Sequence, residues 1–197
     1  MMDHKKLQAL KDVVFKVLQE TGIELMKSYG NIEPDQKDGS EHYTGNIVTE
    51  LDRATEQQIR ESLLEAYPEI GFKGEESGDF NDNNADELTW LVDPIDGTSH
   101  FVRGMPFCTT MISLIEHGEV VFCAIHDFTQ GDIYWAISGM GAFKNEDRIS
   151  ITDRPLNKSF ISLEMNINEY ENLELYKQVF NMVGGMFSSL NSGYEFT

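Results

Sequence analysis

The stretch Trp90-Leu91-Val92-Asp93-Pro94-Ile95-Asp96-Gly97-Thr98 decides how the rest of the sequence is interpreted. A β-prone apolar run leads here into two carboxylates three positions apart. Pro94 has no main-chain N–H and a fixed φ angle, so we expect the strand to stop at Asp93-Pro94. Gly97 permits a close backbone approach or a positive φ, and we expect a short helix to begin there. The first N–H groups of such a helix would form an anion site.

An anion cannot stay beside Asp93 and Asp96 unaided, because all three groups are negative. A divalent cation that bridges carboxylate and phosphate oxygens removes this conflict. Ligation by oxygen alone suits Mg²⁺ better than zinc, which prefers histidine and cysteine. The stretch therefore indicates a magnesium-assisted phosphate site at the exit of a strand.

Acidic residues surround this stretch without basic partners. The region from Gly74 to Val102 contains no lysine or arginine. Half of its eight acids lie among Asn and Gly and are interpreted as a solvated loop: Asp79, Asp82, Asp86 and Glu87. Glu75, Asp93 and Asp96 instead adjoin apolar or glycine-containing sequence. Clustered carboxylates repel one another unless protons or metal ions intervene, so these three give the first indication of chemistry.

The composition limits the possible partners. The chain has 197 residues, 34 Asp and Glu, 15 Lys and Arg, and a net charge of −19, which argues against nucleic acid or an anionic membrane as partner. We find no apolar run of membrane-spanning length and no signal-peptide core at the N-terminus. Its two cysteines, Cys108 and Cys123, give no disulfide framework, so we expect a cytoplasmic protein.

Apolar periodicity and turn residues predict an α+β layered domain in which helices precede a mostly antiparallel sheet. We expect helices over 3–28, 49–67 and 168–183, a loop over 30–45, and strands over 69–73, 89–92, 107–115, 119–125, 132–137, 148–151 and 159–165. His117-Gly118 predicts a hairpin turn. We place Cys108 and Cys123 on the two strands of this hairpin, and interpret His126-Asp127 as a polar pair at a strand end.

The nine-residue string resembles the signature of the inositol monophosphatase family. Three further segments match other motifs of that family in the expected order: 46–52 (Asn-Ile-Val-Thr-Glu-Leu-Asp), 74–77 (Gly-Glu-Glu-Ser) and 139–145 (Gly-Met-Gly-Ala-Phe-Lys-Asn). Together the matches span about half of the chain. The resemblance implies an αβαβα-type phosphatase fold, with two or three Mg²⁺ ions in each site.

The resemblance also implies the metal ligands. Glu75, Asp93 and the main-chain carbonyl of Ile95 would bind one metal ion. Asp93 would bridge to a second ion, which Asp96 would also hold.

The remaining implied roles concern phosphate and water. Main-chain N–H groups of Asp96, Gly97 and Thr98 would hold the phosphate. Thr98, hydrogen-bonded to Asp52, would act with Glu75 to orient and deprotonate the attacking water.

Two features depart from the family pattern. Ser99 and His100 stand where the family usually has Thr and Asn, and we interpret His100 as a structural residue. The downstream W-D-x-A-A-G segment, whose Asp completes the second metal site, does not occur. We therefore expect residues 1–197 to be a single domain that is incomplete at its C-terminus, with its metal and phosphate segment at 46–101.

The leading hypothesis is Mg²⁺-dependent hydrolysis of a small phosphate monoester, similar to inositol monophosphate, by water. Phosphatases of fructose 1,6-bisphosphate or of 3′-phosphoadenosine 5′-phosphate share the metal motifs and remain alternatives. A further alternative is a truncated domain that binds cations without turnover. The family also implies a homodimer.

Overall fold

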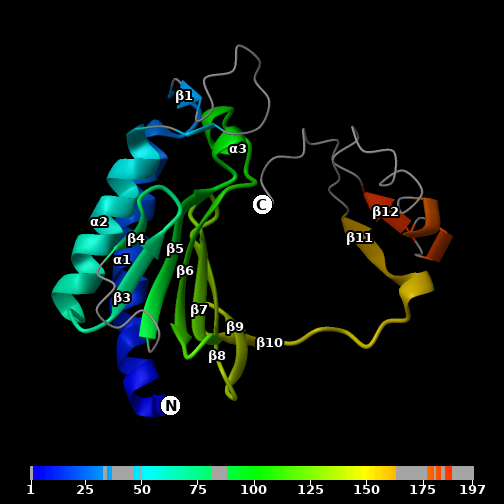
Figure 1. The fold of residues 1–197 in the computed structure, drawn as a ribbon. Coiled ribbons are helices and arrows are strands. Elements are labelled where there is room, and N and C mark those ends of the chain that lie inside the picture. The colour runs from blue at the N-terminus through cyan, green and yellow to red at the C-terminus, as the bar shows by residue number, and fades with distance from the viewer. Residues whose placement is uncertain are drawn as a thin grey trace. The chain divides into compact units, whose positions relative to one another are not determined.

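The structure is a computed structural model that describes residues 2–32, 35–36, 47–48, 50–80, 88–162, 177–179, 181–182 and 185–187. The chain divides into two compact units, residues 1–35 with 48–150, and residues 36–47 with 151–197. Figure 1 shows two long helices beside a large sheet in the first unit. The candidate site residues all belong to this first unit.

Two helices cover one face of the sheet. Helix α1 (His4–Ser28) begins after Asp3, whose carboxylate accepts a hydrogen bond from the Lys6 N–H at 2.8 Å. Helix α2 (Glu50–Ala66) ends before Pro68, the residue that disfavours helix at its predecessor. Both predicted helices are confirmed. Each buries a stripe at three- and four-residue spacing, which is mostly apolar in α1 and includes Ile59 and Leu63 in α2, and both pack against the sheet.

Eight strands form the sheet, in the order β10-β9-β8-β7-β6-β5-β3-β4. Their bounds are β3 (Gly71–Gly74), β4 (Gly78–Phe80), β5 (Leu88–Asp96), β6 (Thr109–Glu116), β7 (Glu119–Asp127), β8 (Asp132–Ile137), β9 (Gly141–Lys144) and β10 (Asp147–Ile149). Strands β3 and β5 run parallel, and the other neighbours are antiparallel. The mostly antiparallel α+β architecture is as predicted.

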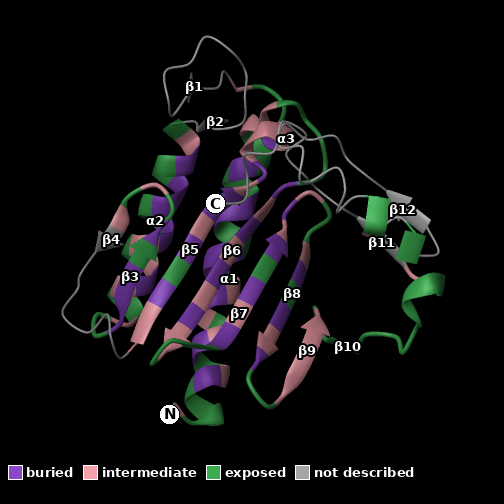
Figure 2. Cartoon of the chain, turned by 45° about the vertical axis from the view of Figure 1, so that its right-hand side comes forward, coloured by how far each residue is buried: buried purple, intermediate pink, exposed green. Residues whose placement is uncertain are grey.

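The core lies between the helices and this sheet. Buried and less buried residues alternate along the central strands, as Figure 2 shows. Trp90, Ile112 and Phe122 come from three adjacent strands and are almost fully buried with Leu10 and Leu18 of α1. Apolar burial of this kind contributes about 25 cal/mol per Å² and fixes the register of each strand.

One expectation about β5 is wrong. The strand does not stop at Asp93-Pro94 but continues to Asp96. Its pairing with β6 shifts between Asp93 and Asp96, then resumes where Asp96 faces Thr109. Pro94 removes a ladder donor without ending the strand, because its carbonyl accepts a hydrogen bond from the Thr110 hydroxyl at 2.9 Å.

The hairpin at His117-Gly118 is confirmed. Both residues have positive φ angles, 52° and 82°, as a two-residue turn between twisted strands requires. The predicted position of Cys108 is wrong, because β6 begins only at Thr109, and Cys108 packs in a second apolar cluster that includes Ile95 and Phe101. Cys123 lies on β7, as predicted.

The glycine-rich turn contains a strand that the sequence analysis missed. Residues 141–144 form β9, and Asn145 then takes a positive φ of 53°. The side-chain oxygen of Asn145 accepts a hydrogen bond from the Ile133 N–H at 2.9 Å. The main-chain carbonyl of Asn145 accepts one from the Trp135 indole N–H at 2.8 Å. This asparagine therefore fastens the turn to β8.

The second unit is described only in part. A turn of 3₁₀ helix (Leu156–Lys158) precedes β11 (Phe160–Ser162), which pairs in parallel with β12 (Gly185–Phe187). Residues 177–179 and 181–182 are helical; the rest of the predicted helix 168–183 lies outside the described residues. Most of the predicted loop 30–45 also lies outside them, although β1 (Asp35–Gln36) pairs with β2 (Ile47–Val48).

Among the described residues, no helix has both the length and the apolar character needed to cross a bilayer.

The contact between α1 and β7 makes a testable prediction. A Cβ on Gly22 would overlap the ring of His126, whose side chain is 5% exposed. We expect Gly22→Ala to destabilise the protein by about 1–3 kcal/mol, although alanine normally favours a helix over glycine. Urea unfolding measures the change. In a His126→Ala background the same substitution should become neutral or stabilising, and an unchanged penalty there would contradict this packing.

Candidate metal and phosphate site

The site forms where the parallel pair of strands ends. Gly74 of β3 faces Val92 of β5 in the ladder, so the residues that follow them, Glu75 and Asp93, come side by side. The Glu75 N–H donates to the Val92 carbonyl at 3.1 Å, which continues this pairing by one step. Parallel strands share one carboxyl edge, so two carboxylates distant in sequence meet at this edge.

Asp93 lies at the centre of this group. Burial, the charge of Glu75, a hydrogen bond with Glu75, and the charges of Asp96 and Asp52 together raise the pKa of Asp93 from 3.8 to about 8. Its Oδ1 atom is buried and has no hydrogen-bond partner among the described residues. A buried acceptor without a donor is costly, so this oxygen is suited to a proton or a cation.

Helix α3 (Thr98–Val102) begins directly after β5, as predicted. The Thr98 hydroxyl lies 2.9 Å from the Asp52 carboxylate and 2.9 Å from the Ile95 carbonyl. It has one proton for two acceptors, so its lone pairs remain available to a donor such as water. Asp52 comes from α2 and is 1% exposed, so its orientation is fixed by the core.

Gly97 allows the chain to turn from β5 into α3. Its φ is +78°, and a Cβ there would overlap the Phe107 carbonyl. An α-helix leaves the N–H groups of its first turn without partners inside the helix, although here the His100 N–H already donates to the Gly97 carbonyl at 2.9 Å. The expected anion site would lie at this turn, next to Asp96, and stays a prediction.

The other residues singled out in the sequence each make a few local contacts. One carboxylate oxygen of Asp96 lies 3.4 Å from the Thr109 hydroxyl. The His100 ring packs edge-on against Phe107, with centroids 5.9 Å apart, and its buried Nδ1 has no partner among the described residues. The Ser99 carbonyl accepts from Arg103. His126 and Asp127 end β7, where the Asp127 carboxylate accepts from the N–H groups of the following turn.

One residue next to the site was missed by the sequence analysis. Glu56 of α2 is 2% exposed and accepts hydrogen bonds from the N–H groups of Glu76 and Ser77, at 2.7 and 3.0 Å. It follows Asp52 by one helical turn. Its position in the sequence could have pointed to it, because Glu56 lies four residues after Asp52, on the same helix face as Ile59 and Leu63, and α2 buries this face.

The donor set fits a hard divalent cation in its chemistry. Side chains and the Ile95 carbonyl offer oxygen alone, and Asp93 has an unpartnered buried oxygen. In the described part of the chain, however, no three His, Cys, Asp or Glu side chains are grouped closely enough to hold an ion by themselves. A cation at this edge would therefore also need the main-chain carbonyl, water, or a closer approach of the carboxylates.

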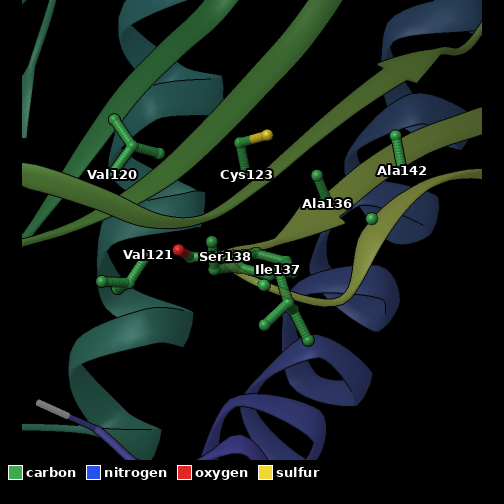
Figure 3. A pocket seen from close by; sticks show the side chains of 10 residues that line it. Val120, Val121, Cys123, Ala136, Ile137, Ser138 and Ala142 are labelled. Carbon is green, nitrogen blue, oxygen red and sulfur yellow. The ribbon is translucent and has the colours of Figure 1, made fainter.

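A separate pocket of about 370 Å³ lies over β7, β8 and β9. Figure 3 shows Cys123, Ala136 and Ala142 among the residues that line it, with Val121 and Ile137 directed toward the helices. Burial raises the pKa of the Cys123 thiol, which makes it a poor nucleophile. None of the predicted site residues lines this pocket.

The fold and the acidic strand exit together define a layered α+β protein with a candidate cation and phosphate site. More specifically, the chain belongs to the inositol monophosphatase family, whose family model matches residues 6–192. The resemblance found in the sequence is thereby confirmed.

Individual proteins that the chain resembles support this family membership. The chain is 34% identical over 144 residues to a fructose-1,6-bisphosphatase/inositol-1-monophosphatase of Thermotoga maritima, covering 72% of this chain and 53% of that protein. It superposes on the extragenic suppressor protein suhB of Bartonella henselae with a TM-score of 0.80 and 27% identity, covering 91% and 69%. SaIMPase-II with inositol monophosphate bound gives 0.72 and 25%, covering 91% and 64%. The chain spans about half the length of the curated relatives it matches.

The turn at Gly97 supplies a stability prediction. Gly97→Ala combines a positive φ with an overlap on Phe107, so we expect a loss of about 2–5 kcal/mol in the free energy of unfolding. Gly118→Ala is the matched control, because Gly118 has a φ of +82° and open space around it. That control should lose only about 1–2 kcal/mol in urea unfolding. Equal losses would show that close packing at Gly97 contributes nothing.

The raised pKa of Asp93 supplies a pH prediction. Because its pKa is about 8 in the folded protein against 3.8 ordinarily, stability should fall as pH rises between these values. Asp93→Asn removes the titration, so without metal the variant should exceed the wild type by about 1 kcal/mol or more at pH 8 and much less at pH 5. Exposed Asp147 gives the control, Asp147→Asn. If the stability difference between Asp93→Asn and the wild type, measured by urea unfolding, does not vary with pH, the raised pKa of Asp93 is refuted.

Proposed function

We propose that this chain carries the metal and phosphate site of a Mg²⁺-dependent phosphate monoester hydrolase that uses water as nucleophile. The observation that carries the proposal is the unpartnered, buried oxygen of Asp93 among carboxylates, beside the start of α3. Family membership and the names of the relatives support a phosphatase activity.

The proposed metal ligands are Glu75, Asp93, Asp96 and the Ile95 carbonyl. Bound magnesium would lower the pKa of a coordinated water and offset the charge of the transferring phosphoryl group. Asp93 is the natural bridging ligand, because it feels the charges of both Glu75 and Asp96. We propose two or three ions in the complete site, as the family resemblance implies.

The proposed handling of water depends on Thr98. The Asp52 carboxylate accepts a hydrogen bond from the Thr98 hydroxyl. The hydroxyl oxygen can then accept a hydrogen bond from the attacking water. Glu75 is the proposed base: its side chain is exposed at the strand exit, where a water can reach it. Phosphate oxygens would bind the main-chain N–H groups of Asp96, Gly97 and Thr98, where the first turn of α3 offers donors and a favourable dipole.

The proposed substrate is a small phosphorylated molecule similar to inositol monophosphate. Support comes from SaIMPase-II, which was solved with that ligand, and from the names of several relatives. The Thermotoga maritima relative also bears the name fructose-1,6-bisphosphatase, so that substrate stays an alternative. Hydrolysis of 3′-phosphoadenosine 5′-phosphate is the third candidate. A cytoplasmic location, a homodimer and the absence of nucleic-acid or membrane partners remain predictions.

A second candidate is a cation-binding domain without turnover. It is favoured by one observation: in the described part of the chain, no three His, Cys, Asp or Glu side chains are grouped closely enough to hold an ion by themselves. Metal titration and phosphate release, measured on the same preparation, separate the two candidates. Binding with release supports hydrolysis, and binding without release supports the second candidate.

Asp93→Asn tests the proposed site. We expect Mg²⁺ binding in isothermal titration to weaken strongly and phosphate release from inositol monophosphate to fall on the order of a thousandfold, because the metal loses its bridging carboxylate. Asp147→Asn should match the wild type in both measurements. If Asp93→Asn retains near-normal release and metal affinity, the strand exit is not the reacting centre.

A further inference from the structure

We infer that Glu56 is a positioning residue that holds the turn bearing Glu75 in place for metal binding. This inference rests on the proposed function for the role of Glu75. Nothing in the family motifs quoted above includes Glu56. The structure gives three independent observations for it: two hydrogen bonds, near-complete burial, and a glycine that leaves room for its carboxylate.

The hydrogen bonds fix both sides of the carboxylate. Glu56 Oε2 accepts from the Glu76 N–H at 2.7 Å, and Oε1 accepts from the Ser77 N–H at 3.0 Å. Two consecutive main-chain donors that converge on one carboxylate define the path of the turn, much as a carboxylate caps the start of a helix. Glu75, immediately before them, is anchored on its other side by its own N–H bond to Val92.

Burial and packing make this arrangement stiff. Glu56 is 2% exposed, so its carboxylate is shielded from water and is held by the main-chain N–H groups that it accepts from. Gly74 directly precedes the turn, and a Cβ at that position would overlap the Glu56 carboxyl group. The close approach of backbone and carboxylate thus requires glycine here, which explains the first residue of the Gly74-Glu75-Glu76-Ser77 motif.

Helix α2 links the two halves of the site. Asp52 and Glu56 are four residues apart and therefore lie on one face of the helix. Asp52 holds Thr98, on the phosphate and water side, while Glu56 holds the turn that presents Glu75, on the metal side. Residues that hold metal ligands in position without touching the metal orient those ligands. Their loss typically costs about 10–100-fold in metal affinity or activity.

The test compares Glu56→Ala, Glu56→Gln and the control Glu65→Ala, which removes an exposed carboxylate from the same helix. Two readouts are taken on the 197-residue chain, well below its melting temperature. Hydrogen exchange of the Glu76 and Ser77 amides reports the bonds without any metal. Isothermal titration with MgCl₂ reports the metal site without any turnover.

For Glu56→Ala we expect faster exchange at both amides and a Mg²⁺ dissociation constant raised about 10–100-fold. Glu56→Gln keeps one acceptor oxygen but turns an NH₂ donor toward the second N–H, so one amide should lose protection and the dissociation constant should rise by an intermediate factor. It also serves as the deciding variant if Glu56→Ala does not fold. The control should stay within about twofold of the wild type.

Three results would overturn or redirect the inference. Unchanged amide exchange in folded Glu56 variants would show that these bonds do not hold the turn. Faster exchange with unchanged Mg²⁺ affinity would show that Glu56 serves the fold alone. If the wild type itself does not bind Mg²⁺, the proposed function fails, and amide exchange still decides whether Glu56 holds the turn.

Discussion

Asp93 and Glu75 share a hydrogen bond where the parallel pairing of β3 with β5 ends, and the proposed site depends on this contact. Parallel pairing brings the residues that follow Gly74 and Val92 together, so two acids 18 positions apart become neighbours. Their proximity is unfavourable without a proton or a cation. The energy that core burial supplies to β3 and β5 therefore offsets a local electrostatic cost.

Local sequence signals were sufficient for much of the fold. Helix α1 follows from its apolar period and Asp3 cap, and the β6–β7 hairpin follows from His117-Gly118, whose positive φ angles suit a two-residue turn. The motif near Asp93 also placed two carboxylates at the end of a buried strand, although that strand runs on to Asp96. These features depend on residues close in sequence, where propensity and spacing carry most of the information.

Tertiary contacts decided the rest. Pro94 argued for the end of a strand, yet β5 continues because the Thr110 hydroxyl bonds the Pro94 carbonyl from the neighbouring strand. Glu56 looked like one more charge on a helix until the structure brought Glu76 and Ser77 to its carboxylate. In both cases the partner lies more than ten residues away. No window of local sequence contains such a pairing.

The position of Asp52 and Glu56 on one helix has a consequence for how the protein loses its site on heating. The sheet is held by its own ladders and by α1 as well as α2. Partial melting of α2 would release Thr98 and the Glu75 turn in a single step while most strands stayed paired. Loss of the proposed site would then precede collapse of the sheet, so a probe of the sheet alone would overestimate the temperature range in which the site is intact.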